Sequence, residues 1–368
     1  MKKKNLCKTL LKTMCIVLGI LILALLAYIV YLYASYYRIE DNQELVVEAP
    51  VDDTTTGAAA VLATDTEYSA VTYNIGFGAY LPDYSFFMDG GTSSWAESPE
   101  TVQYAINGAG ELVKSLDPDF ALIQEIDLDA TRSYHTDEYE MLRNILPEYT
   151  TVFAQNYDSA FLFYPFTQPH GSSRAGLGLF SKYPVSSALR RSFPISTSFS
   201  KFFDLDRCYS VSRIPVDNGK ELVIFNLHMS AYGNSDEIRK GQIEMLCNDM
   251  AKEYEAGNYV LCGGDFNHDL KASEEDTESC ESWAFPFPRT ELPEHFAFCL
   301  DLLSSEEQAA LWNSARNADM EYVPGVTYTV TLDGFIISDN IECLSYENVN
   351  TGYSYSDHDP VKVEFVLK

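Results

Sequence analysis

An uncharged run of twenty residues, MCIVLGILILALLAYIVYLY from Met14 to Tyr33, divides this chain of 368 residues. At helical rise this length spans the hydrocarbon core of a bilayer. A buried core helix of this length usually carries a polar face, and the apolar region of a cleavable signal peptide is shorter, about 7–15 residues, and ends at a small-residue cleavage site. We therefore predict an uncleaved transmembrane signal anchor at residues 14–33.

The residues on either side of this run predict its orientation. Residues 1–13 contain five lysines and no acidic residue, and four tyrosines lie between residues 31 and 37. Basic residues stay on the cytoplasmic side of a membrane, and tyrosines are common at its interfaces. We expect a cytoplasmic basic tail at 1–13, a single pass through the cell membrane with the N-terminus inside, and an extracellular remainder.

The segment that follows the anchor is acidic. Ile39–Glu67 contains eight acidic residues, no Lys or Arg and no apolar periodicity, so we predict that residues 34–67 form a flexible stalk. From Ile39 onward the chain has 19 basic and 54 acidic residues, a net charge of −35. Such a surface does not attract polyanions by itself. Nucleic acid is therefore not the favoured partner, although bound metal ions could offset the charge locally.

A strand–helix–strand pattern occurs twice in residues 68–368. SAVTYNI (69–75) and FALIQEI (120–126) read as strands around a helical segment, and so do ELVIFNLHMS (221–230) and NYVLCGGDFN (258–267). Further strands are expected at TVFAQN, GLGLFS, CYSVSRIPV, GFIIS and VKVEFVL. Alternating strands and helices indicate α/β layers. This number of strands indicates two sheets packed face to face, with helices outside.

Polar residues of a few types stand at the ends of these strands. They are Asn74, Glu125, His228, Asp265 with Asn267, Asp333, and Asp357 with His358. One polar residue at a strand end is ordinary, because loops begin there. Six placements drawn only from Asp, Glu, Asn and His indicate a site where loops meet the edge of a sheet.

These residue types suit one kind of chemistry. Glu125 and the aspartates are hard oxygen ligands fit for Mg²⁺, and the lack of an H-E-x-x-H motif or a cysteine cluster disfavours zinc. Two histidines near acids can transfer protons and stabilise developing charge. The set suits activated water attacking an anionic phosphorus centre. There is no G-x-S-x-G elbow, P-loop or G-x-G-x-x-G motif after a strand, so other chemistries find less support.

Seven blocks of the sequence resemble, in order, those of the endonuclease/exonuclease/phosphatase superfamily. They are TYNIG, LIQEID, GLGLFSKYPV, FNLHMS, GGDFN, LDGFIIS and SDHDPV. That family includes pancreatic-type deoxyribonucleases, abasic-site endonucleases, neutral sphingomyelinases and inositol-phosphate 5-phosphatases. The resemblance covers Tyr68–Lys368. The chain as a whole looks like a membrane-anchored, bacterial-type member of this family. It implies a catalytic domain at 68–368 with the fold of a four-layer α/β/β/α sandwich, and a phosphoric ester hydrolase that uses Mg²⁺, with Mn²⁺ as the alternative.

The resemblance also implies roles for the strand-end residues. The metal or phosphate site is expected to comprise Glu125, Asn74 and Asp357. The catalytic group is expected to comprise His228, Asp265, Asn267, Asp333 and His358. In it, His228 resembles the contact to the scissile phosphate, and Asp265 resembles the residue that orients or deprotonates the nucleophile. Asn267 resembles the Asn beside the transition state, Asp333 resembles the Asp that orients the terminal histidine, and His358 resembles the catalytic imidazole.

Three further residues are candidates for substrate binding: Asn156, Tyr157 and Arg132. Tyr157 is equally compatible with a core or rim aromatic, and Arg132 with a surface salt bridge. The setting of Arg132 is similar to a subgroup related to proteins that remodel the lipids of GPI anchors. The run FLFYPF at 161–166 is predicted to be a buried strand rather than a membrane-facing lip.

The loops after Asn74 and Asn267 contain aromatic residues that either face an apolar substrate or pack the loops onto the sandwich. They are Tyr80, Tyr84, Phe86, Phe87, Trp95, Trp283, Phe285 and Phe287.

Three functions stay open. The first is an extracytoplasmic, Mg²⁺-dependent phosphoesterase acting on lipid-linked or small phosphomono- or phosphodiesters. The second is a surface nuclease that cuts external DNA. The third is a catalytically silent binding module, which is disfavoured because no core catalytic position has been lost. Acidity and the membrane anchor favour the first function, and we expect the protein to be a monomer.

Overall fold

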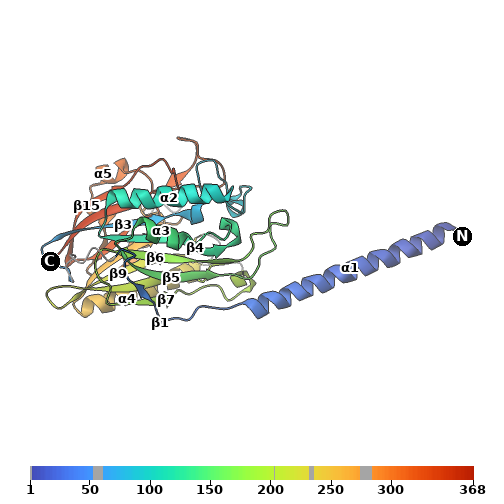
Figure 1. Cartoon of the computed structure of the whole chain (residues 1–368), viewed down its shortest axis with the longest axis horizontal. Helices are drawn as coiled ribbons and strands as arrows, with labels where there is room; N and C mark the ends of the chain where they lie inside the picture. The colour runs from blue at the N-terminus through green and yellow to red at the C-terminus, as the bar shows by residue number, and fades with distance from the viewer. Residues whose placement is uncertain (1, 53–60, 203, 232–235, 274–283) are drawn as a thin grey trace. The chain divides into compact units, whose positions relative to one another are not determined.

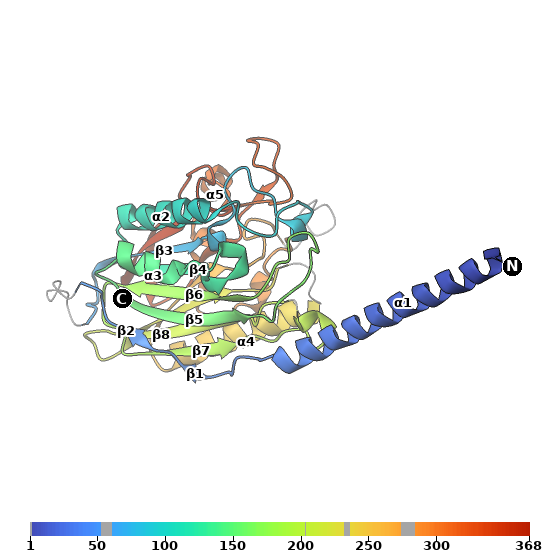
Figure 2. The same ribbon diagram turned by 45° about the vertical axis from the view of Figure 1, so that its right-hand side comes forward.

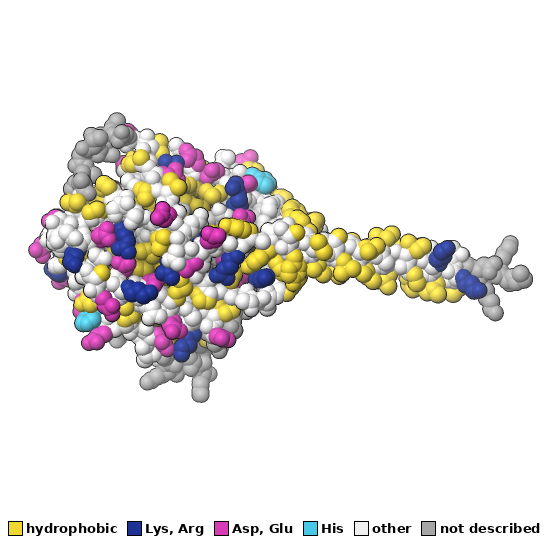
Figure 3. All heavy atoms as spheres, turned by 90° about the horizontal axis from the view of Figure 1, so that it is seen from below, with side chains coloured by type: hydrophobic (Ala, Val, Ile, Leu, Met, Phe, Trp, Pro, Cys, Tyr) yellow, Lys and Arg dark blue, Asp and Glu magenta, His cyan; other side chains and the backbone are white. Residues whose placement is uncertain are grey.

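The computed structural model describes residues 2–52, 61–202, 204–231, 236–273 and 284–368, and it divides into two compact units at Arg38 and Ile39. The first unit is helix α1 (Lys2–Ser35). Its segment Leu6–Ser35 is long and apolar enough to cross a membrane. Hydrophobic side chains extend along this helix in Figure 3. The helix is longer than the uncharged run at both ends. It includes the basic residues before Met14 and ends two residues after Tyr33.

The second unit contains two seven-stranded mixed sheets. In order across the first sheet, the strands are β15 (Ile341–Asn348), β16 (Val361–Leu367), β3 (Glu67–Asn74), β4 (Phe120–Ala130), β6 (Ser173–Ser181), β5 (Thr150–Asp158) and β2 (Val47–Glu48). In order across the second sheet, they are β1 (Gln43–Glu44), β7 (Ser187–Ser192), β8 (Cys208–Pro215), β9 (Glu221–His228), β10 (Tyr259–Asp265), β14 (Asp333–Ser338) and β11 (Phe296–Phe298). A separate two-stranded sheet pairs β12 (Ala315–Arg316) with β13 (Thr329–Val330).

Helices cover both outer faces of the paired sheets. Helices α2 (Pro99–Leu116) and α3 (Glu138–Ile145) lie over the first sheet, and α4 (Asp236–Glu255) lies over the second (Figures 1 and 2). The other helical segments are α5 (Ser305–Ala310) and the 3₁₀ turns η2 (Gly76–Gly78), η3 (Phe87–Asp89), η4 (Thr131–Ser133), η5 (Phe199–Phe202), η7 (Arg289–Glu291) and η8 (Cys299–Leu302). The expected four-layer α/β/β/α sandwich is confirmed.

Side-chain alternation builds the two cores. On β3 and β4, Ala70 and Leu122 join Phe225 in the core between the sheets, whereas their neighbours Tyr73 and Ile123 join the core beneath α2 and α3. This alternation follows from the two-residue period of a strand. Polar side chains also link the two sheets across the inner core, where Gln124 Nε2 donates to Asn226 Oδ1 at 2.8 Å. A buried amide pair of this kind fixes the register of one sheet against the other.

Strand direction brings the strand ends to one edge. Strands β3 and β4 are parallel, as are β9 and β10, and Asp265 is the register partner of both His228 on β9 and Asp333 on β14. Gly264 makes the approach to β9 possible. A Cβ there would lie 2.1 Å from the Leu227 carbonyl oxygen, and its φ is +147°. Only glycine fits this position without displacing a strand.

The predicted stalk is wrong over most of its length. The second unit begins at Ile39, β1 pairs with β7, and β2 pairs with β5. The backbone N–H of Ile39 donates to Asp206 Oδ2 at 2.6 Å, and Leu62 is fully buried. The folded domain thus starts at Ile39 rather than at Tyr68, and residues 53–60 lie outside the described residues. The acidic composition suggested a flexible stalk, but short strands can pair with a sheet edge through backbone groups alone, whatever their side chains.

The prediction of a buried strand at 161–166 is also wrong. These residues form part of the loop between β5 and β6, which extends beyond the strand ends in Figure 1. Phe163, Tyr164 and Phe166 are 50%, 62% and 85% exposed. Apolar composition suggested burial, but the run lies after Asp158, the last residue of β5, and before Ser173, the first residue of β6.

Candidate active site

Asp265, at the end of β10, is the centre of the polar cluster. Asn74 Nδ2 donates to Asp265 Oδ2 at 3.1 Å and to Glu125 Oε1 at 3.2 Å. The backbone N–H of Asn267 donates to Asp265 Oδ1 at 2.8 Å. His228 Nε2 lies 3.4 Å from Asp265 Oδ2 and 3.9 Å from Glu125 Oε1. Residues from four separate segments thus meet around a single carboxylate.

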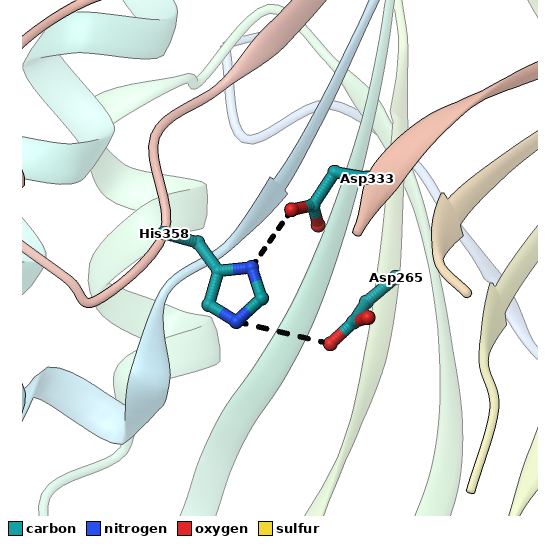
Figure 4. Close-up of side chains that lie close together, drawn as sticks. All are labelled: Asp265, Asp333 and His358. Atoms are coloured by element: carbon teal, nitrogen blue, oxygen red, sulfur yellow. Dashed lines mark hydrogen bonds and ion pairs between the residues drawn. The ribbon is translucent and has the colours of Figure 1, made fainter. Parts of the chain in front are cut away.

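A buried histidine–aspartate pair stands on the other side of Asp265. His358 Nδ1 lies 2.8 Å from Asp333 Oδ2, and Ser314 Oγ donates to the same oxygen at 2.7 Å. His358 Nε2 points toward Asp265 Oδ2, at 3.9 Å (Figure 4). Because Asp333 engages Nδ1, the other ring nitrogen remains directed at Asp265. The sequence stretch around His358 therefore contributes its imidazole in a fixed orientation.

The surroundings give the two histidines opposite charge states. Burial disfavours the charged form of His358, but attraction to Asp333 outweighs it and raises its pKa well above the usual value. Burial, then repulsion from Arg207 and His358, lowers the pKa of His228 well below the usual value. Burial raises the pKa of Asp265 to about 7, against the attraction of His358. At neutral pH the cluster holds one imidazolium, one neutral imidazole and one carboxyl that can exchange a proton.

Glu125 reaches the cluster through an irregularity in β4. Its φ is +56°, and the pairing of β4 with β6 shifts register between Ile123 and Ile126. Such a bulge re-aims a side chain at the cost of a strained backbone. The Glu125 carboxylate is thereby turned out of the strand and toward the pocket.

The carboxylates next to Glu125 fit a hard divalent cation. Burial raises the pKa of Asp89 to about 7, and repulsion from Asp357 and then Glu125 adds to this effect. Asp89, Glu125 and Asp357 all line the pocket, and carboxylate oxygens are the ligands that Mg²⁺ prefers. Asn74 Nδ2 holds Glu125 and Asp265, and its Oδ1 accepts from the Gly76 N–H at 3.0 Å. Asn74 therefore positions the carboxylates, and its expected place in the metal or phosphate site stays a prediction.

A second group of possible metal ligands, Asp265, Asp333 and His358, lies within 4.8 Å. The hydrogen bond between His358 Nδ1 and Asp333 Oδ2 already uses one possible ligand atom of each of these two residues. We therefore interpret it as a hydrogen-bonded network.

These residues surround a pocket of about 340 Å³. Of the predicted site residues, those lining it are Glu125, Arg132, Asn156, Tyr157, His228, Asp265, Asn267, Asp357 and His358. The other two, Asn74 and Asp333, contact the lining from behind. All eleven predicted residues are therefore brought together, although their roles stay predictions.

Arg132 is not the surface salt bridge that the sequence left open. It is 7% exposed, and its Nε and Nη2 donate to the two Asp127 oxygens at 3.1 and 2.9 Å. Its guanidinium also lies 3.7 Å from the centre of the Phe77 ring. A buried, stacked and bidentate arginine is held rigidly. Arg132 is thus a fixed positive charge in the pocket wall.

The sequence interpretation missed Arg207, which directly precedes β8 and lines the pocket. It is 7% exposed, and its Nε and Nη1 are buried without a hydrogen-bond partner among the described residues. A buried guanidinium with unused donors is costly unless an anion binds it. Asp89, His170 and Arg316 also line the pocket and were missed. None of the four lies in a motif, so their only local signal is their residue type.

The comparison with known families agrees with this geometry. Residues 71–302 match the model described as "Endonuclease/Exonuclease/phosphatase family". The chain belongs to the endonuclease/exonuclease/phosphatase family. Members of this family are hydrolases that act on phosphoesters and typically depend on a divalent metal. No curated protein matches the chain in sequence.

Solved structures of the same family share the fold. The endonuclease/exonuclease/phosphatase from Beutenbergia cavernae is 14% identical, with a TM-score of 0.55 over 82% of this chain and 72% of that one. The family protein from Bacteroides vulgatus is 17% identical, with a TM-score of 0.53 over 83% and 100% of the two chains. D. rerio TDP2, complexed with a single-strand DNA product, is 14% identical, with a TM-score of 0.54 over 82% and 99%.

Proposed function

We propose that this protein is a membrane-anchored, extracytoplasmic, Mg²⁺-dependent phosphoesterase that hydrolyses a lipid-linked or small phosphomono- or phosphodiester. The observation that carries the proposal is that Arg207 Nε and Nη1 are buried without a hydrogen-bond partner among the described residues, in the pocket that also contains His358, paired with Asp333, and the Glu125 carboxylate. The Arg207 guanidinium can bind an anion, His358 can donate a proton, and the Glu125 carboxylate can hold a cation. A phosphoester with its metal ion meets all three requirements.

The residues divide the reaction between them. Glu125 and Asp357 would hold the divalent ion, which, when bound, polarises a phosphoryl oxygen. Asp265, with a pKa of about 7, accepts the proton of the attacking water. The imidazolium of His358 stabilises charge on the phosphoryl group or protonates the leaving oxygen, and Asp333 keeps its Nε2 facing the reaction. Arg207 binds a non-reacting anionic oxygen of the substrate.

Two sequence features favour a lipid or small substrate over DNA. The extracytoplasmic part carries a net charge of −35, whereas a DNA-binding surface needs Lys and Arg along successive phosphates. An apolar helix precedes the domain. The nuclease remains the second candidate, because TDP2 with its DNA product has the same fold.

The test is hydrolysis by the purified full chain in detergent, with Mg²⁺ or Mn²⁺, of duplex DNA, sphingomyelin, phosphatidylinositides and a chromogenic diester. We expect a lipid or small ester to be cleaved with higher kcat/KM than DNA at about 0.15 M salt, where weak polyanion binding is screened. Glu125→Gln should lose most of the turnover and its metal dependence. Asp129→Asn, an exposed change on the same strand, is the matched control.

Three results would count against the proposal. Hydrolysis of plasmid alone would favour the nuclease. A folded chain inactive toward every ester would favour a silent binding module. Unchanged metal dependence in Glu125→Gln would remove Glu125 from the metal site.

A further inference from the structure

The run Phe161–Phe166, called here the aromatic loop, presents large apolar side chains to solvent from a firmly held backbone. Leu162 and Gly171 exchange two backbone hydrogen bonds at 3.0 Å, and the His170 N–H donates to the Tyr164 carbonyl at 3.2 Å. Phe166 is nevertheless 85% exposed and Tyr164 is 62% exposed. Soluble proteins rarely leave such contiguous apolar surface in water unless it meets a partner or a membrane.

The aromatic loop is continuous with the rim of the pocket. The Tyr164 ring lies 5.8 Å from that of Phe87, which lies 6.1 Å from His170 in the pocket wall. Met88, next to Phe87, also lines the pocket and is 56% exposed. Whatever covers the aromatic loop therefore also lies beside the pocket mouth.

The polypeptide enters the domain at this same edge. Ile39 donates to Asp206, whose neighbours Leu205 and Arg207 line the pocket. The Arg190 guanidinium donates both to the Ile39 carbonyl, at 3.5 Å, and to the Gln155 carbonyl, at 2.7 Å, near the end of β5. The entry point and the pocket thus share one end of the sandwich.

Chain connectivity limits how far this edge can be from the membrane segment. Helix α1 ends at Ser35, so only residues 36–38 precede Ile39. An extended residue spans at most about 3.6 Å, so Ile39 lies within roughly 15 Å of the helix end in any orientation. The predicted stalk would have allowed a much larger separation between the helix and the domain than these three residues do.

The scarcity of charged residues at this edge favours a bilayer as its partner. Residues 159–172 contain no Asp, Glu, Lys or Arg, in a chain with 54 acidic residues. Residues 193–202, which precede Asp204 and Leu205 of the pocket wall, contain Lys201 and no acid. Entry into a lipid interface requires the absence of carboxylates, and aromatic rings are favoured there.

We propose that the aromatic loop inserts into the interface of the same bilayer that α1 crosses, so that the pocket opens at the level of the lipid headgroups. This inference rests on the proposed membrane anchor and not on the proposed hydrolysis. Phe163, Tyr164 and Phe166 enter the interface, and Met88 lies at its boundary. A lipid-linked substrate would then reach Arg207 and Glu125 without leaving the membrane.

The test places a fluorescent reporter in the aromatic loop of the full chain, reconstituted in phosphatidylcholine vesicles with or without brominated acyl chains. Phe166→Trp adds an indole in the loop. Leu344→Trp adds one on β15 at a site that is 47% exposed, and serves as the matched control. Relative to the parent chain, we expect bromine to remove most of the added emission of Phe166→Trp and little of that of Leu344→Trp.

Equal, weak quenching of both variants in vesicle-bound protein would overturn the inference. So would shielding of Phe166→Trp that depends on protein density and not on bromination, because that result indicates a second copy of the chain. Flotation of the protein with the vesicles tests the anchor separately, and cleavage of a soluble chromogenic diester tests the phosphoesterase separately. Thermal unfolding at the parent temperature confirms that each variant is folded.

Discussion

At the scale of single residues, the pairing of His358 with Asp333 determines what the imidazole can do. The pair is buried, and Ser314 fixes the carboxylate from a third direction. An imidazole held at Nδ1 cannot rotate away from Asp265, so its Nε2 keeps one direction throughout a reaction. Both orientation and charge of the histidine therefore depend on Asp333.

We expect His358→Ala to lower kcat on a chromogenic diester by about 10²–10⁴-fold, the usual range for a general acid or base. Asp333→Asn should produce part of this loss, because the amide keeps the shape but not the charge. Steady-state kinetics at saturating Mg²⁺ measures both. Near-normal turnover in a folded His358→Ala chain would remove the histidine from the reaction.

A second residue-scale prediction concerns His170. Burial, with a smaller effect of the Arg132 charge, lowers the pKa of His170 to about 3. In the unfolded chain it titrates near 6.5. Between these values only the unfolded chain binds the proton, so the free energy of unfolding falls as pH decreases through this window. At pH 5 the loss is about 2 kcal/mol, from about 1.4 kcal/mol for each pH unit below 6.5.

Replacing His170 with Gln removes the titrating group. We expect the difference in unfolding free energy between pH 7.5 and pH 5 to shrink by about 2 kcal/mol in His170→Gln relative to the parent. Urea unfolding of the detergent-solubilised chain measures it. Identical pH dependence in both proteins would mean that His170 titrates normally when folded.

At the scale of elements, the segment before β3 belongs to the fold. Leu62 is fully buried, and its N–H donates to the Pro215 carbonyl at 2.8 Å, whereas its neighbour Val61 is 39% exposed. We expect Leu62→Ala to lower the free energy of unfolding by about 2–5 kcal/mol. Val61→Ala, the matched control, should change it by less than about 0.5 kcal/mol. If both changes are neutral in chemical denaturation, the segment does not pack as described.

The sequence predicted those elements whose signals are local. Apolar runs with period two located the central strands, and the polar residue ending each run located Asn74, Glu125, His228 and Asp265. Parallel pairing then had to bring those ends together. The seven family blocks gave His358 and Asp333 their order, and the four-layer sandwich followed from the same blocks.

The features that the sequence did not predict depend on contacts with segments far along the chain. Arg207 becomes a pocket residue only because β8 pairs with β9, and Asp89 lies in a loop that is held by the hydrogen bond from the Phe86 N–H to the distant Ala318 carbonyl. Of the rim aromatics, Tyr80, Tyr84, Phe86 and Phe287 are buried and pack the loops, Phe285 is exposed, and Trp283 lies outside the described residues. The acidic segment seemed unstructured for the same reason, since its partners β5 and β7 lie far along the chain.

At the scale of the whole molecule, lysines before the apolar run and the lack of Lys or Arg from Ile39 to Glu67 predict a cytoplasmic N-terminus and an extracellular domain. A membrane-impermeant, lysine-directed reagent should therefore label Lys240 and Lys252, which have side chains 69% and 70% exposed, in intact cells. Lys8 and Lys12 should be labelled only after lysis. Mass spectrometry distinguishes the peptides. The reverse pattern would invert the orientation.

The pairing of β1 and β2 with different sheets also dictates an order of events during biosynthesis. These two strands leave the ribosome directly after α1, but β2 pairs with residues 151–152 and β1 with residues 189–190. Both strands therefore stay unpaired while the chain up to their partner residues is translated. Closure of both sheet edges can occur only after Arg190 has been translated. A ribosome that stalls before that point would leave β1 without its partner strand, and unpaired strands are sites of aggregation.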